Sequence, residues 1–240
     1  MHKSSLPEGV LYTEKQMKKT LRILRRASKD SEPYWQEFEY ETADGSATVA
    51  TTLMTLPVTW EHSCLQKKCG ACAMVINKVP RLACDTRLAD LKGDSVTVEP
   101  LRKFPVIEDL LVDRKDMMDR LEELKIWFAD DADVSRGREM AFEASKCLQC
   151  GLCLEVCQNF HTEGKFGGMA AMAPLARLIS KMPDAQVKEL RRSYKKAVYD
   201  GCGKSLACRD ICPAGINIED LLVRSNAAAI WKRRLRDEEE

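Results

Sequence analysis

Hallmarks of several protein classes are missing from this chain of 240 residues. It has only three histidines (His2, His62 and His161), too few for a convincing acid–base apparatus, and no Ser/His/Asp set or phosphate-binding glycine loop. No apolar run is long enough to cross a bilayer, and residues 1–15 lack the apolar core of a secretory signal. The net charge is only +1, so no strong field attracts nucleic acid. We therefore expect no membrane span, no export signal and no nucleic-acid partner.

Cysteine, in contrast, is abundant, because the chain contains eleven. A disulfide framework would need an exported chain and an even number of thiols. Structural zinc sites take four ligands each, so two of them would leave three cysteines unused. Iron–sulfur clusters remain, and the spacing of the cysteines favours them. The cysteines fall into two zones, at 64–84 and at 147–212.

The first zone has the ligand spacing of a plant-type ferredoxin. Cys64, Cys69, Cys72 and Cys84 follow the pattern C-x4-C-x2-C-x11-C. The first three must curl around a compact cluster, and Gly70 is the small residue that permits the backbone to approach it. We therefore expect these four cysteines to hold a 2Fe–2S cluster.

The second zone contains two runs typical of bacterial ferredoxins, in which the fourth cysteine of one run binds the cluster of the other. The first run spans 147–157 as C-x2-C-x2-C-x3-C, whereas the second has Ser205 where a further cysteine would stand. The crossover rule then gives four thiolates for a 4Fe–4S cluster (Cys147, Cys150, Cys153 and Cys212) and three for a 3Fe–4S cluster (Cys157, Cys202 and Cys208). Ligation of a fourth iron by the Ser205 oxygen stays open as an alternative, although serine is a poorer ligand than thiolate.

The hydrophobic patterns predict different folds for the two zones. Alternating or β-branched runs indicate strands before and around the first zone, and capped apolar runs indicate helices in the second. We expect an α+β chain with a plant-type ferredoxin β-grasp domain at 1–113 and an all-α bacterial-ferredoxin-like domain at 114–240. The expected elements are strands at 21–26, 37–42, 73–77 and 95–99, a connecting helix from the N-cap Asp113, and helices at 168–182 (interrupted or begun near Pro174), 184–201 (Asp184 to Gly201) and 217–231 (opening with Asn217).

With these motifs, the chain resembles the iron–sulfur subunits of succinate dehydrogenase and fumarate reductase. The segments SCLQKKCGACAMVINKVPRLAC, CLQCGLCLEVC and CGKSLACRDICPAGI are similar to the three cluster segments of that family, including its three-cysteine second run. The resemblance implies an oxidoreductase subunit without a dicarboxylate site of its own. A partner flavoprotein would interconvert succinate and fumarate at FAD, and electrons would pass singly through the 2Fe–2S, 4Fe–4S and 3Fe–4S clusters to a quinone.

The same resemblance implies where the chain works. The quinone would lie where this subunit meets a membrane anchor subunit, with or without haem. We therefore expect a peripheral protein on the cytoplasmic face of the inner membrane of a prokaryote. The apolar, methionine-rich segment 166–179 is a candidate docking surface for the anchor, and internal helix packing is the alternative.

Several departures from the family's usual pattern leave questions open. Lys67 and Lys68 would raise the potential of the 2Fe–2S cluster if they faced it, and would have no such effect if they pointed to water. Gln158 stands where the family usually has a proline. Ubiquinone-type members usually have a tryptophan and a histidine where this chain has His161-Thr162 and Gly203, so their ubiquinone contacts do not carry over to it. A different quinone, such as menaquinone, or another acceptor is therefore an alternative.

A second class of function keeps the clusters but changes their partners. The chain would then serve a soluble flavoprotein that reduces fumarate or a related acid, without a quinone. Relatives of that kind often continue into a cysteine-rich module, which these 240 residues lack. We therefore expect the quinone-linked function.

Overall fold

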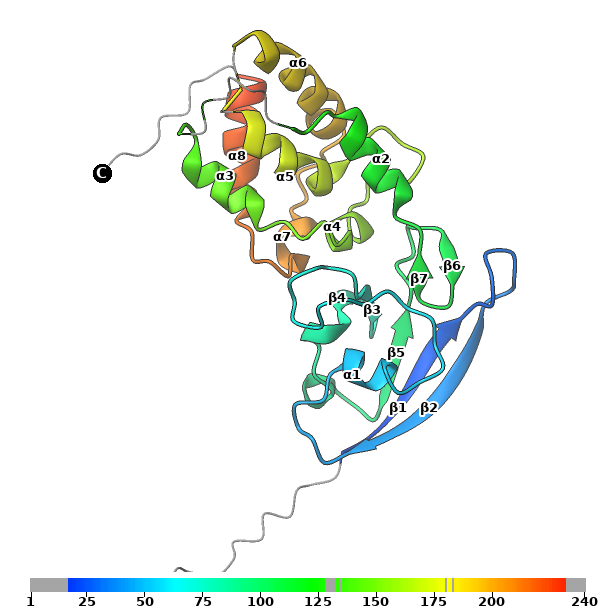
Figure 1. Ribbon diagram of the computed structural model, residues 1–240. Helices are drawn as coiled ribbons and strands as arrows, with labels where there is room; N and C mark the ends of the chain where they lie inside the picture. The colour runs from blue at the N-terminus through cyan, green and yellow to red at the C-terminus, as the bar shows by residue number, and fades with distance from the viewer. Residues whose placement is uncertain (1–16, 128–132, 134, 180, 183, 232–240) are drawn as a thin grey trace, which may run out of the picture.

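The computed structural model describes residues 17–127, 133, 135–179, 181–182 and 184–231. In Figure 1, a sheet built from the N-terminal part lies below a group of helices built from the C-terminal part. The expected α+β architecture is thereby confirmed. The predicted boundary at residue 113 falls between the last strand of the N-terminal part and the first helix of the C-terminal part.

The N-terminal part is organised around one mixed sheet. Its strands run in the order β2-β1-β5-β3-β4. β1 and β5 pair in parallel, and every other pair is antiparallel. The five strands are β1 (Met17–Arg25), β2 (Tyr34–Thr42), β3 (Ala73–Ile76), β4 (Val79–Leu82) and β5 (Ser95–Glu99).

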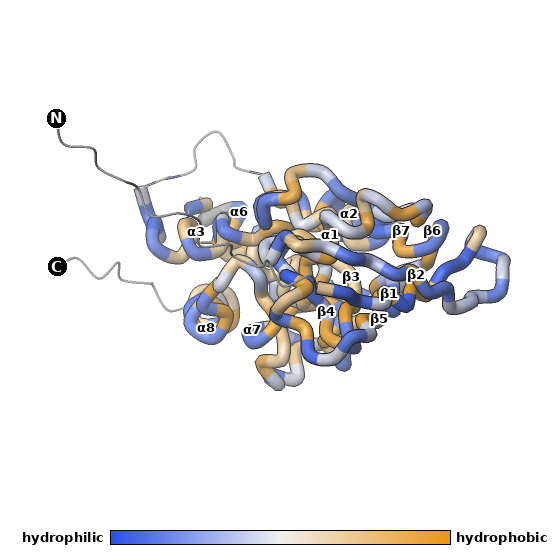
Figure 2. Tube along the Cα trace, turned by 90° about the horizontal axis from the view of Figure 1, so that it is seen from below, coloured by the Kyte–Doolittle hydropathy of each residue, from blue (hydrophilic) through white to orange (hydrophobic). Residues whose placement is uncertain are grey.

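Alternation along the strands decides which face is buried. In β1, Leu21 and Ile23 are fully buried while Arg22 between them is exposed. Figure 2 shows hydrophilic and hydrophobic stretches mixed through the N-terminal part. All four expected strands are present. The strand β4 is not among those expected. It contains Pro80, which is tolerated because β4 is an edge strand.

Short elements complete the N-terminal part. A capping box between Thr48 and Thr51 starts the first helix, because each side chain accepts a hydrogen bond from the backbone N–H of the other. The elements are α1 (Val49–Leu53), the 3₁₀ turns η1 (Ala83–Asp85) and η2 (Leu88–Asp90), and a two-stranded sheet of β6 (Val106–Glu108) and β7 (Leu111–Val112).

The C-terminal part is helical, with α5 at its centre. This helix contacts α3, α4, α6 and α8, and all of its residues except Pro174 and Arg177 are buried. Segment 166–179 therefore forms internal packing, and its expected use as a docking surface is wrong. The helices are α2 (Lys115–Glu123), α3 (Arg138–Ser145), α4 (Leu152–Glu155), α5 (Gly168–Ile179), α6 (Asp184–Tyr194), the π-helical turn η3 (Lys195–Tyr199), α7 (Ala207–Ile211) and α8 (Ile218–Ala229).

The helix ends differ slightly from the expected ones. The connecting helix α2 has Arg114, not Asp113, at its N-cap position, and Asp113 Oδ1 instead accepts from the N–H of Lys115 at 2.7 Å. α5 continues through Pro174, and α6 changes to π-helical geometry at residue 195. Asn217, at which the third helix was expected to open, is the N-cap of α8, since its side chain accepts from the N–H of Asp220 at 3.2 Å.

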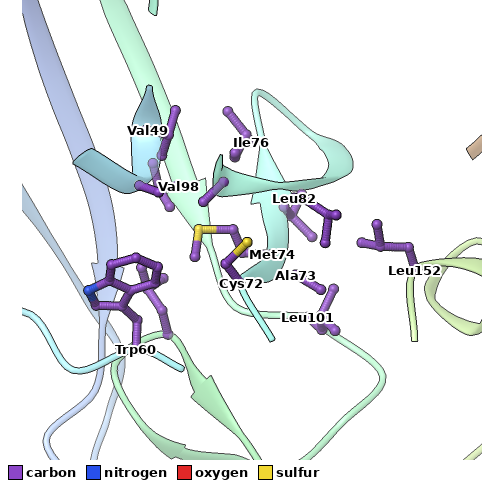
Figure 3. Close-up of a cluster of buried hydrophobic side chains, with 14 of the residues drawn as sticks. Val49, Trp60, Cys72, Ala73, Met74, Ile76, Leu82, Val98, Leu101 and Leu152 are labelled. Atoms are coloured by element: carbon purple, nitrogen blue, oxygen red, sulfur yellow. The ribbon is translucent and has the colours of Figure 1, made fainter. Parts of the chain in front are cut away.

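One hydrophobic core crosses from the sheet into the helical part. Leu152 and Leu154 of α4 are fully buried and belong to the same cluster as Leu101 and Ala73. In Figure 3, Leu152 approaches the strand residues from the side of the helical part and faces Ala73 and Leu101. The N-terminal and helical parts are therefore joined by apolar packing as well as by the chain. No helix in the described part of the chain is long and apolar enough to span a membrane.

Candidate iron–sulfur cluster sites

The loop before β3 curls around the first group of cysteines. Leu65 and Lys67 adopt left-handed backbone conformations, with φ of 51° and 59°. This curl turns successive N–H groups inward. The N–H groups of Gln66 and Lys68 each lie 3.3 Å from Cys64 Sγ, and the N–H of Lys67 lies 3.3 Å from the Sγ atom of the fourth cysteine in this group, Cys84.

These contacts suit thiolate ligands. The N–H groups of Gln66 and Lys68 lower the pKa of the Cys64 thiol to about 7, because they stabilise its anion. Burial raises the pKa of the Cys72 thiol to about 12. A buried thiol of this kind ionises when a metal cation compensates its charge. The donor set therefore fits iron.

The charge of Lys67 is paired with a carboxylate and is partly exposed to water. Its ammonium group pairs with Asp85 at 2.7 Å, and its side chain is 44% exposed. An exposed, paired lysine interacts only weakly with a nearby site. The potential increase that would follow if Lys67 faced the cluster is therefore not expected.

The remaining seven cysteines line two neighbouring cavities. One cavity is bounded by Cys147, Cys150, Cys153 and Cys212. The other is bounded by Cys153, Cys157, Cys202 and Cys208, together with Ser205. The structure thus brings together the same two groups that the crossover rule gives, and Cys153 lies on the wall between them. All eleven cysteines are described, and all are free thiols.

Burial again makes these thiols poor acids on their own. It raises the pKa of Cys147 to about 11 and that of Cys153 well above its usual range. It also raises the pKa of Cys208. Because metal ligands must be deprotonated, such buried thiol groups are suited to a site where iron compensates their charge.

The first loop and the C-terminal run are in direct contact. Gly70 has φ +75°, and a Cβ placed on it would lie 2.7 Å from Cys150 Cβ and 3.0 Å from the carbonyl oxygen of Leu148. Only a glycine permits this approach. The three groups of thiols therefore follow one another through the molecule without an intervening layer of side chains.

Comparison with known proteins supports the same chemistry. Residues 20–119 match the model of a 2Fe–2S iron–sulfur cluster binding domain, and residues 143–216 match that of a 4Fe–4S dicluster domain. The succinate dehydrogenase iron–sulfur subunit of Bacillus subtilis is 36% identical over 87% of this chain and 92% of its own length. The chain belongs to the succinate dehydrogenase and fumarate reductase iron–sulfur subunit family.

Other members of the family agree. The fumarate reductase iron–sulfur subunit of Mycobacterium tuberculosis is 33% identical over 78% of this chain and 83% of its own length. A chain of the Mycobacterium smegmatis Sdh1 complex has the same fold, with a TM-score of 0.73 at 23% identity, and the match covers 91% of this chain and 98% of that chain. As a member of this family, the protein is an iron–sulfur electron-transfer subunit of an oxidoreductase, with 2Fe–2S and 4Fe–4S domains.

Polar residues that the sequence did not single out surround the proposed ligands. Lys103 of the N-terminal part donates from Nζ to the carbonyl oxygen of Cys157 and to that of Phe160, the latter at 3.3 Å. Asn159 donates to the carbonyl of Gly201 at 2.7 Å, which ties together the two cysteine runs. Sequence alone could not identify these residues, because their partners are distant in the chain.

His161 is exposed, and its backbone carbonyl takes part in a hydrogen bond. Its carbonyl oxygen accepts from Arg120 at 3.0 Å, and the same arginine donates to Phe166 O at 2.7 Å. Arg120 also lies over the ring of Phe160. These contacts hold the segment after the first run in place.

Gln149 was also missed, although Pro174 provides a signal for it. Proline has no N–H, so the carbonyl of Ala170 lacks its usual partner four residues later in α5. Gln149 Nε2 donates to this carbonyl at 3.2 Å and lies 3.4 Å from Cys147 Sγ. The helix defect thus holds an amide N–H beside a proposed cluster ligand.

Replacing Gln149 by leucine should lower the reduction potential of the 4Fe–4S cluster. Hydrogen bonds to ligand sulfurs stabilise the reduced, more negative cluster, and this variant removes one. Redox titration followed by electron paramagnetic resonance measures the change. Gln66→Leu makes the same substitution on an exposed side chain of the first loop and retains its backbone donor. An equal potential in the Gln149 variant and the wild type would contradict the assigned hydrogen bond.

Proposed function

We propose that this chain carries electrons between the FAD of a partner flavoprotein and a membrane quinone. In this proposal, residues 1–113 form the 2Fe–2S domain, and residues 114–240 form the domain with the other two clusters. The ligands are Cys64, Cys69, Cys72 and Cys84 for 2Fe–2S, Cys147, Cys150, Cys153 and Cys212 for 4Fe–4S, and Cys157, Cys202 and Cys208 for 3Fe–4S.

The observation that carries the proposal is the continuous series of three thiol groups. The first two groups touch where Gly70 meets Cys150, and the last two share Cys153. When bound, iron–sulfur clusters take up and release single electrons at potentials that their surroundings tune. The chain's part is to hold them close together, bury them and supply N–H donors to their ligands.

The two ends of this series suit different partners. At one end, Cys69 is exposed, and we assign that face to the flavoprotein. At the other end, Gln158, Asn159 and Lys204 line the cavity beside the proposed 3Fe–4S ligands. Their side chains are polar groups that can hydrogen-bond a quinone carbonyl. We therefore place the quinone and a membrane anchor subunit, with or without haem, at that end. In this arrangement, the complex lies on the cytoplasmic face of a prokaryotic inner membrane.

Iron content and paramagnetic resonance of the anaerobically purified complex test the assignment of clusters. We expect about nine irons for this subunit and a signal in the oxidised sample, because an oxidised 3Fe–4S cluster is paramagnetic. Oxidised 2Fe–2S and common 4Fe–4S clusters are silent. About ten irons and a silent oxidised sample would contradict the 3Fe–4S assignment.

The Ser205→Ala variant separates the two outcomes further. Ser205 lines the cavity beside the proposed 3Fe–4S ligands. Its two chain neighbours, Lys204 and Leu206, both adopt left-handed backbone conformations. If its oxygen binds a fourth iron, the variant will contain one iron fewer than the wild type. We expect an unchanged iron content and an unchanged oxidised signal. Reduction of a quinone by succinate in the complex then tests the proposed acceptor.

A further inference from the structure

Arg114 lies at the junction between the two parts of the chain, at the N-cap of α2. Its side chain is only 11% exposed, and arginine is rarely buried unless it is paired. Nη2 donates to the carbonyl oxygen of Ala71 at 2.8 Å. The same nitrogen lies 3.4 Å from Glu61 Oε2, whose side chain is exposed. The negative charge of Glu61 is therefore screened by water, whereas the positive charge of the buried Arg114 guanidinium is not.

Both cluster sites border this guanidinium. Ala71 lies in the first loop between Gly70 and Cys72, and Gly70 touches Cys150 of the C-terminal run. Arg114 is thus a buried cation held against the first loop, next to the point where that loop meets the C-terminal run.

One donor of this side chain has no acceptor. Arg114 Nε is buried and has no hydrogen-bond partner among the described residues. Buried polar groups in folded proteins are normally paired, so this donor needs an explanation. The sulfur atoms of an iron–sulfur cluster and its ligands accept hydrogen bonds, and such bonds set the cluster's potential.

We propose that Arg114 raises the reduction potentials of the 2Fe–2S and 4Fe–4S clusters and that its Nε–H donates to sulfur of the 4Fe–4S site. This inference rests on the proposed ligands of these two clusters. Reduction adds one electron to a cluster, and a neighbouring cation stabilises the added negative charge. The guanidinium stays protonated throughout and exchanges no proton. Arg114 is thus a positioning residue that sets the potentials of the clusters on both sides of the junction.

Arg114→Met and Arg114→Gln test the inference in the purified complex. Methionine removes the charge and keeps an unbranched chain, whereas glutamine retains an N–H that can donate to Ala71. Redox titration followed by paramagnetic resonance measures each midpoint potential. In both variants, we expect one-electron reduction of the 4Fe–4S cluster to become about tenfold less favourable, a fall of about 59 mV. The 2Fe–2S potential should fall by less. In Arg114→Lys, much of the fall should be restored.

Arg87→Met is the matched control. Arg87 carries the same charge near the first cysteine group, but its side chain is 59% exposed and paired with Asp90. Its removal should leave both potentials unchanged. The inference is overturned if Arg114→Gln contains the wild-type amount of iron and has the wild-type 4Fe–4S potential. If Arg114→Met loses iron, the potential of the glutamine variant still tests the inference. A wild-type complex that lacks these two clusters would contradict the proposed function instead, and its iron content would distinguish that outcome from a failure of the inference.

Discussion

Replacing Gly70 by alanine should destabilise the protein by about 2–5 kcal/mol, which combines left-handed strain with overpacking. The new Cβ would lie 2.7 Å from Cys150 Cβ and 3.0 Å from Leu148 O. One neighbour is a backbone atom and the other is the first side-chain atom of a proposed ligand, so neither can rotate away. The first cysteine loop must therefore move away from the helical part. Thermal unfolding of the complex should shift downward by about 5–15 °C.

Gly93→Ala separates the two contributions to this effect. Gly93 has the same φ of +75°, but nothing lies within 4 Å of the added Cβ. This control carries the backbone strain without the clash, so it should cost only about 1–2 kcal/mol. Electron transfer between the first two clusters should also slow in the Gly70 variant alone. Equal melting temperatures for the two variants would show that the loop contact at Gly70 does not have the tight geometry described.

Replacing Asp109 by alanine should cost about 3–5 kcal/mol, the usual effect of breaking a buried ion pair. Its side chain is 2% exposed and pairs with Arg25 at 2.8 Å. The same carboxylate accepts from the N–H groups of Arg26 at 3.2 Å and Thr59 at 3.0 Å. One side chain therefore joins the end of β1, the segment before the first cysteine loop and the β6–β7 sheet. Chemical denaturation followed by circular dichroism measures the loss.

The charge of Asp109 also gives its contribution a defined pH dependence. Burial alone would raise the pKa of this carboxyl, but hydrogen bonds from Arg25 and Thr59 outweigh burial and lower it. Its stabilising effect is therefore fully present above the unfolded-state pKa of about 3.9 and is lost as pH falls through the lower folded-state pKa. Asp109→Asn keeps the shape and should lack this dependence. Asp90→Ala, at an exposed ion pair, should change stability by less than about 1 kcal/mol. Similar losses for Asp90→Ala and Asp109→Ala would contradict the buried pairing.

The grouping of the cysteines could be predicted from the sequence, because cluster ligation depends on short, local spacings. The four cysteines of the first group and those of the two runs behind them are brought together in the predicted sets, although ligation itself stays a proposal. Strand and helix types were also predictable from periodicity. The boundaries of the elements were less predictable. A proline such as Pro80 weakens the pattern of an edge strand, and Pro174 does not interrupt α5.

The missed residues act through contacts that no local pattern encodes. Gln149 matters because a proline 25 positions later removes a helix N–H. Arg114 matters because it binds Ala71, whose neighbour Gly70 meets Cys150. Segment 166–179 was ambiguous for a related reason. Methionine and alanine suit either a docking surface or a core, and only the surrounding helices show that this segment is core.

The core that crosses from the sheet into α4 limits how freely this protein could be recombined with its relatives. Leu152 and Leu154 complete a cluster whose other members, such as Leu101 and Phe104, belong to the N-terminal part. A ferredoxin module transplanted from another subunit would have to bring a surface complementary to these leucines. Substitutions on one side of the junction therefore limit those that the other side tolerates. We expect the two parts to have evolved together rather than as interchangeable modules.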